Sequence, residues 1–121
     1  MIKIGIDVGS TTAKLVAVDE NDNLLFSKYE RHNAKAKETI LSFLKELLSE
    51  IGDKDISVRI TGSIGMGISE KCSLPFVQEV VAAAKAIQKD YSHVTSMIDI
   101  GGEAVSYTHL RANETLANLV C

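Results

Sequence analysis

The chain contains 121 residues, 45% of them hydrophobic and 24% charged, with a formal net charge of −3. This length suits one globular domain with a real core and is too short for two typical domains. The weakly acidic charge gives no basic surface for nucleic acid, and no stretch reaches the roughly 18 consecutive apolar residues of a membrane helix, so we expect a cytoplasmic protein without nucleic-acid or membrane partners.

The first part of the chain predicts an antiparallel sheet. Residues 2–8, 14–19 and 24–31 run or alternate apolar in short blocks, and a polar cluster at residues 20–23 separates the second block from the third. Short apolar blocks divided by turn residues are typical of a three-stranded meander.

Helices and strands alternate in the remainder of the chain. Residues 35–51 place apolar side chains at helical spacing, and Gly52 follows where a C-terminal cap belongs. The order β-β-β-α-β-α-β-α, followed by one more strand, predicts a mixed α/β sheet. The later elements are expected as a strand at 56–61, a helix at 64–71, a brief strand at 76–77, a helix at 79–91 and a strand at 94–100.

The stretch GIDVGSTTAK, residues 5–14, carries the first candidate site. A strand that ends in Asp-x-Gly and turns through three hydroxyl residues presents backbone N–H groups and hydroxyls, which suit phosphate oxygens. Asp7 at the strand end can hold Mg²⁺ through its water shell. The alternative is a plain hairpin turn whose polar groups satisfy only the turn itself. The candidate phosphate-binding residues are Gly9, Ser10, Thr11, Thr12 and Lys14.

A second bend repeats this pattern late in the chain. In IDIGG, residues 98–102, an apolar strand carries Asp99 and then bends at Gly101 and Gly102, as IDVGS does at residues 6–10. Repeats of this kind indicate duplicated units. Two phosphate-binding bends that face each other would hold the phosphates of a nucleotide across a cleft, although the second bend alone also fits an ordinary tight turn.

These motifs together resemble a known family. GIDVGSTTAKLV and IDIGGE, with TGSIGMG and LPFVQEVVAAAKAI between them, are similar to the N-terminal part of the ATPases that activate 2-hydroxyacyl-CoA dehydratases and benzoyl-CoA reductases. The likeness is greatest to the long acyl-CoA dehydratase activase-related proteins. That family belongs to the superfamily of actin, sugar kinases and heat-shock chaperones, which duplicates a ribonuclease-H-like domain around an ATP cleft.

The resemblance implies a fold and a set of site residues. Residues 1–92 would form a ribonuclease-H-like mixed sheet, the first half of an actin-like ATPase, and residues 93–104 would begin the second half. Asp7 would act as a catalytic and metal-binding residue, and Glu79 would organise Mg²⁺ or the attacking water. The first phosphate loop would contain Gly9, Ser10, Thr11, Thr12 and Lys14. The second would begin with Asp99, Gly101, Gly102 and Glu103.

The resemblance also implies a function for the full-length protein. Binding and hydrolysis of ATP, with Mg²⁺ as cofactor, would drive an electron from a [4Fe–4S] cluster bridging two subunits to a 2-hydroxyacyl-CoA dehydratase or a related CoA-ester reductase. The partners would be nucleotide, that dehydratase and a second copy of the chain. Cys72 and Cys121 stand at no cluster spacing, so the cluster ligands are absent here and this chain alone is expected to be inactive.

The last residues depart from the family. After Glu103 the family would continue with an acidic residue, Ala and Lys, but residues 105–121 match nothing in it and carry only a weak helical spacing. We interpret them as foreign sequence appended to a truncated chain, such as a translated sequencing adapter. Two alternatives for the function remain: a sugar- or acetate-kinase-type member of the same superfamily, and a non-catalytic interaction domain with the same fold.

Overall fold

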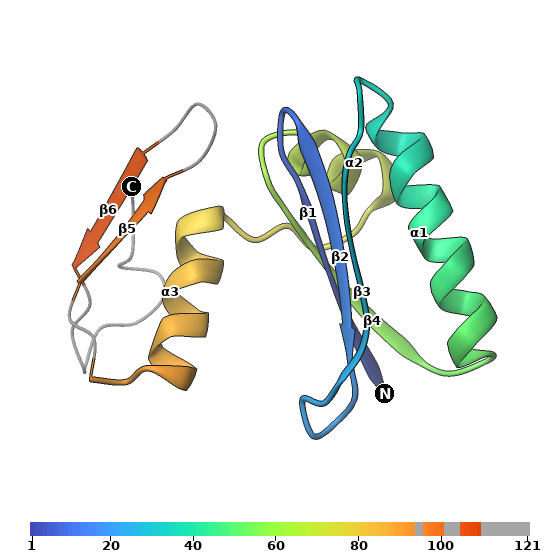
Figure 1. Ribbon diagram of the computed structural model, residues 1–121, viewed down its shortest axis with the longest axis horizontal. Coiled ribbons are helices and arrows are strands. Elements are labelled where there is room, and N and C mark those ends of the chain that lie inside the picture. The colour runs from blue at the N-terminus through green and yellow to red at the C-terminus, as the bar shows by residue number, and fades with distance from the viewer. Residues whose placement is uncertain (94–95, 101–104, 110–121) are drawn as a thin grey trace. The chain divides into compact units, whose positions relative to one another are not determined.

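The structure is a computed structural model that describes residues 1–93, 96–100 and 105–109. The chain separates into two compact units, Met1–Phe76 and Val77–Cys121, and each is considered by itself (Figure 1). Within the described residues, no helix is both long and apolar enough to cross a membrane.

The first unit is a mixed sheet with helices. Its four-stranded sheet has the order β3-β2-β1-β4, in which β1 pairs antiparallel with β2 and parallel with β4. Because β1 and β4 are parallel, the chain crosses over between them through a helix. The elements in chain order are β1 (Ile2–Val8), β2 (Thr12–Val18), β3 (Leu24–Arg31), α1 (Ala36–Ile51), β4 (Ile56–Thr61) and α2 (Gly65–Cys72).

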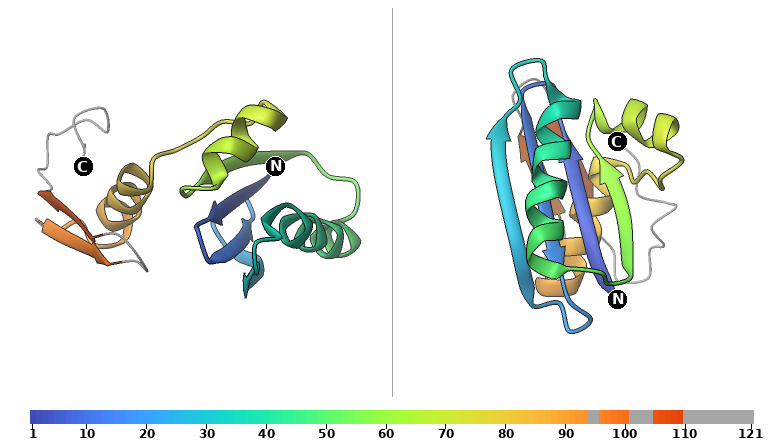
Figure 2. Two further views of the ribbon diagram at one scale, coloured as in Figure 1. Left: turned by 90° about the horizontal axis from the view of Figure 1, so that it is seen from above. Right: turned by 90° about the vertical axis from the view of Figure 1, so that its right-hand side faces the viewer.

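One face of this sheet carries the core. The strand β1 alternates strictly between buried and exposed residues, as a strand with a single covered face does. Figure 2 shows α1 lying along that face, and Phe43 and Leu47 of α1 are buried in the same cluster as Ile4 and Ile6 of β1. At the end of α1, Gly52 adopts a positive φ of 69° and donates its N–H to Leu48 O at 3.1 Å, so the cap predicted at Gly52 is confirmed.

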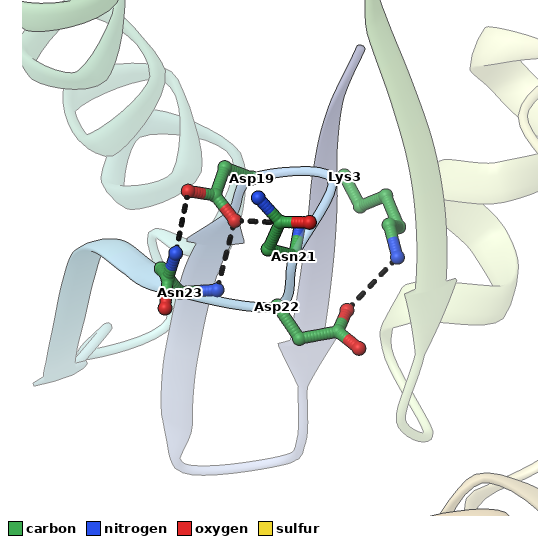
Figure 3. A network of polar contacts seen from close by, with 5 residues as sticks. All are labelled: Lys3, Asp19, Asn21, Asp22 and Asn23. Atoms are coloured by element: carbon green, nitrogen blue, oxygen red, sulfur yellow. Dashed lines mark hydrogen bonds and ion pairs between the residues drawn. The ribbon is translucent and has the colours of Figure 1, made fainter.

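A polar turn joins β2 to β3 (Figure 3). The carboxylate of Asp19 accepts hydrogen bonds from the backbone N–H of Asn21 at 2.8 Å, from that of Asn23 at 2.9 Å and from Asn23 Nδ2 at 3.0 Å. An aspartate that bonds the backbone two residues on is a common device for closing a turn. The polar cluster at residues 20–23 is therefore a turn, as the sequence predicts.

The second unit begins with α3 (Glu79–Asp90), in which Val80 and Ala84 are buried. Then β5 (Ser96–Ile100) and β6 (Val105–His109) form a two-stranded antiparallel sheet. The helix and strand predicted at 79–91 and 94–100 are thus present with shorter bounds.

Two segments differ from the expectation. The brief strand predicted at Phe76-Val77 is reduced to a single parallel bridge between Phe76 and Ile60, because Pro75 precedes it and α3 begins three residues later. Residues 105–109, for which no strand was expected, form the strand β6, and their assignment to a foreign tail stays a prediction. Residues 110–121 lie outside the described part of the chain. The division at residues 92 and 104 stays a prediction.

Candidate phosphate-binding loop

The first candidate site is the connection between β1 and β2. The last residue pair of these strands is Val8 with Ala13, so residues 9–12 make the turn. Gly9 donates its backbone N–H to Thr12 O at 3.0 Å, and Ser10 and Thr11 are exposed at the tip. The hydroxyl residues predicted to form a loop therefore lie together at one sheet end.

Among the described residues, some backbone groups of this loop form hydrogen bonds and others do not. The carbonyl of Thr11 accepts the backbone N–H of His32 at 3.1 Å, and the carbonyl of Gly9 lies 2.8 Å from His32 Nε2. Within residues 1–93, the N–H groups of Ser10 and Thr11 donate no hydrogen bond. Two exposed residues of the turn thus have backbone donors without a partner in this part of the chain, and such donors in a turn can bind anions.

Asp7 lies directly beside this loop. It is the penultimate residue of β1, is exposed, and pairs in register with Lys14 of β2 and Thr61 of β4. The Lys14 ammonium lies 5.1 Å from the centre of the Tyr29 ring on β3. An ammonium, a carboxylate and a hydroxyl therefore follow one another in this order across β2, β1 and β4, next to the loop. Thr61 Oγ1 is buried and has no hydrogen-bond partner within the described residues.

The connection from β4 to α2 closes against Asp7. Gly62 has a φ of +96°, and a Cβ at this position would lie 2.3 Å from Val8 O and 2.8 Å from Asp7 Oδ1. Ile64 donates its N–H to Val8 O at 3.0 Å. Only glycine fits residue 62, because any side chain would collide with the end of β1 and strain the backbone.

The structure does not require a glycine at residue 9, although the sequence suggested that it would. We expected this glycine to make the bend possible, but its φ is not positive, and a Cβ there would lie 3.9 Å from Thr12 O, an ordinary contact. The close approach to β1 is instead made at Gly62. A short glycine motif in the sequence does not reveal which glycine is sterically required.

The second bend matches the first in the length of its connection. Asp99 is the penultimate residue of β5, and the last pair, Ile100 with Val105, leaves residues 101–104 as the connection. The connection is as long as that between β1 and β2, at residues 9–12. Gly101, Gly102 and Glu103 lie outside the described residues.

The structure brings together only part of the predicted site. Asp7, Lys14 and residues 9–12 lie at one end of the first unit, whereas Glu79 begins α3 in the second unit. His32, which contacts the loop twice, is missing from the predicted set. The sequence gives little sign of this role, because a single histidine after a strand belongs to no recognisable motif. Its contact with Gly9 also joins residues 23 positions apart.

A metal site would need several ligand side chains close together. The described part of the chain contains no group of three or more His, Cys, Asp or Glu side chains that could hold a metal ion. Its cysteine, Cys72, is a free and exposed thiol.

No family model matches the chain. An uncharacterized protein of Methanocaldococcus jannaschii is 27% identical over 118 residues, which are 97% of this chain and 46% of that protein. The chain therefore spans about half the length of the curated relative that it matches.

Solved structures are similar over most of the chain. The activator of 2-hydroxyisocaproyl-CoA dehydratase from Clostridium difficile, with bound ADPNP, has a TM-score of 0.77 and 24% identity over 99% of this chain and 45% of that one. Component A of (R)-2-hydroxyglutaryl-CoA dehydratase from Acidaminococcus fermentans has a TM-score of 0.76 and 22% identity, covering 93% and 44%. A ROK family glucokinase from Streptomyces griseus, in complex with glucose and AMPPNP, has a TM-score of 0.59 and 17% identity, covering 94% and 46%.

These likenesses confirm the expected fold class. The mixed α/β chain has the fold of about half of each of these proteins, a dehydratase activator, a dehydratase component and a glucokinase. The resemblance to dehydratase activators noted in the sequence motifs is thus confirmed at the level of the fold. Identities below 25% carry no further conclusion about activity.

Proposed function

We propose that this chain is the nucleotide-phosphate-binding first half of an ATP-dependent activator of a 2-hydroxyacyl-CoA dehydratase or a related CoA-ester reductase. The single observation that carries the proposal is the turn at residues 9–12, where the amides of the exposed residues Ser10 and Thr11 donate no hydrogen bond within residues 1–93, close to Asp7 near the end of β1. Free backbone donors at a strand end suit phosphate oxygens.

The residues present fit a magnesium nucleotide. Asp7 is exposed and Gly62 places no side chain over its Oδ1, so a hydrated Mg²⁺ that bridges phosphate oxygens could rest there. Lys14, in register with Asp7, would add positive charge. Asp99, Gly101, Gly102 and Glu103 would form the second phosphate loop, and Glu79 would orient Mg²⁺ or water, with the two halves closed on the nucleotide.

Electron delivery belongs to the complete protein. By resemblance to the activators, the state of the cleft would be coupled to transfer of an electron to the dehydratase from a [4Fe–4S] cluster shared by two subunits. Cys72 is the cysteine of the described part, and it stands alone, so the cluster ligands would come from the other half. We therefore propose a homodimeric, cytoplasmic protein in full length and no turnover by this chain alone.

The test is a titration of the ¹⁵N-labelled chain followed by amide NMR shifts. MgATP and magnesium tripolyphosphate should both move the amides of residues 9–12, whereas adenosine should not, because the loop recognises phosphate rather than the base. In D7N, Mg²⁺ should no longer strengthen ATP binding, since the carboxylate that holds its water shell is gone. The matched control is D53N, which removes an exposed carboxylate far from the turn in sequence.

Several results would overturn the proposal. Unmoved amides at residues 9–12 with saturating MgATP would remove the phosphate-loop assignment. In the protein continued through its second half, we expect ATP hydrolysis that depends on Mg²⁺. Phosphoryl transfer to a sugar or to acetate there would instead indicate a kinase, and loss of Mg²⁺-dependent ATP binding would indicate a non-catalytic interaction domain.

A further inference from the structure

We propose that His32 is a positioning residue that holds the turn at residues 9–12 in its phosphate-binding shape. The contacts of His32 with the turn are seen in the structure itself, whereas their effect on nucleotide affinity rests on the function proposed above. His32 follows the last residue of β3 and is 5% exposed. It contacts the turn with both its backbone and its ring.

The contacts of His32 determine how backbone amides of the turn are oriented. Its backbone N–H binds Thr11 O at 3.1 Å, and its Nε2 lies 2.8 Å from Gly9 O. Two carbonyls of the turn are thereby drawn to one buried residue. Since a peptide unit directs its N–H opposite to its C=O, fixing the carbonyl of Gly9 also fixes the amide of Ser10, which donates no hydrogen bond within residues 1–93, and fixing the carbonyl of Thr11 fixes the amide of Thr12.

The ring contact assigns a tautomer to His32. A carbonyl oxygen can only accept, so Nε2 must carry the hydrogen in its contact with Gly9. Nδ1 is buried and has no partner within the described residues. Within the described residues, the contact of Nε2 with Gly9 O is therefore the hydrogen bond that orients the ring of His32.

A short turn anchors His32 between two regular elements. Lys35 donates its N–H to His32 O at 2.7 Å, and the residues between them, Asn33 and Ala34, have φ values of 48° and 63°. Positive φ at both central positions is the mark of a type I′ turn, and α1 begins directly afterwards at Ala36. The imidazole is thus fixed from β3 on one side and α1 on the other.

The test compares two variants of His32 with one control. H32L keeps much of the volume but cannot donate to Gly9 O, whereas H32Q supplies an amide N–H at a similar reach. The matched control is S69A, because Ser69 is equally buried at 6% exposure and also donates to a backbone carbonyl, that of Leu74 at 2.5 Å, but lies in α2. The probes are magnesium tripolyphosphate affinity, amide hydrogen exchange at residues 9–12 without ligand, and ¹⁵N–¹H spectra of the wild-type ring.

Four results support the proposal. H32L weakens tripolyphosphate binding on the order of tenfold, the effect of about one lost hydrogen bond, and speeds exchange at residues 9–12. H32Q restores most of the affinity. S69A leaves affinity unchanged. The ring spectra place the proton on Nε2.

Opposite results overturn it. Wild-type affinity and exchange in H32L, a loss in S69A as large as that in H32L, or a proton on Nδ1 would each refute the positioning role. The ring spectra need no variant, so they decide even where H32L fails to fold. If the wild-type chain binds no tripolyphosphate at all, the proposed function fails, whereas the tautomer and the exchange at the turn still test His32.

Discussion

At the scale of single residues, the candidate site depends on groups that were hard to recognise in the sequence. Asp7 and the hydroxyl turn were predictable because a strand ending in Asp-x-Gly is a local pattern. The steric role of Gly62 was not, because it depends on how β4 meets β1. The contact of His32 with Gly9 likewise joins residues 23 positions apart. Predictions from local pattern succeed where the contact itself is local.

Gly62 gives the first prediction at this scale. We expect G62A to destabilise the protein by roughly 1–3 kcal/mol or more, because the new Cβ would lie 2.3 Å from Val8 O and alanine disfavours a φ of +96°. Urea unfolding measures the effect. The control is G67A in the interior of α2, where a Cβ meets nothing within 4 Å and alanine should stabilise by about 0.5–1 kcal/mol. Equal effects of the two changes would contradict the packing of residue 62.

At the scale of elements, periodicity predicted most of the helices and strands. The strands at Ile2–Val8 and Ile56–Thr61 have the predicted bounds, because alternation and apolar runs depend only on neighbouring residues. The strand expected at Phe76-Val77 is reduced to one bridge, because Pro75 precedes it and α3 begins at Glu79. No pattern marked β6, whose partner β5 decides its place.

The turn between β2 and β3 gives a prediction for pH. The backbone N–H of Asn23, followed by its side chain, lowers the pKa of Asp19 below its ordinary value of 3.8. The folded protein thus favours the ionised carboxylate of Asp19. The stabilisation that these hydrogen bonds provide is present above the pKa of Asp19 in the unfolded chain, and it is lost as the pH falls through the lower pKa of the folded protein. Urea unfolding midpoints between pH 5 and 2 should therefore fall less steeply in D19N than in wild type.

D53N serves as the control for that measurement. Asp53 is exposed and makes no hydrogen bond or ion pair with another described residue, so its variant should follow the wild-type pH profile. The Asp19 interpretation fails if D19N and D53N have the same profile, because the hydrogen bonds that favour the ionised carboxylate would then contribute nothing.

At the scale of the whole molecule, the two units differ in how their strands are supported. In the first, β1 is hydrogen-bonded on both sides and buried among the side chains of α1. In the second, β5 and β6 pair only with each other within the described residues. A two-stranded sheet is marginal in water, whereas a central strand over a core opens only with the whole unit.

Amide hydrogen exchange of the chain tests this difference. We expect the slowest amides in β1 and exchange at least about a hundredfold faster in β5, which corresponds to an opening free energy lower by about 2.7 kcal/mol. The edge strand β3 serves as the internal comparison and should lie between them. Equal protection of β1 and β5 would mean that both units unfold as one.

The parallel pairing of β1 with β4 also fixes an order of assembly. The strands β1, β2 and β3 follow one another through short turns, so this meander can form early from nearby contacts. The strand β4 can join β1 only after the intervening chain, with α1 in it, has closed into a loop, at an entropic cost. The turn at residues 9–12 and His32 belong to the early part, while Gly62 arrives with the late strand. We therefore expect the close approach of Gly62 to Asp7 to form only when β4 joins the sheet.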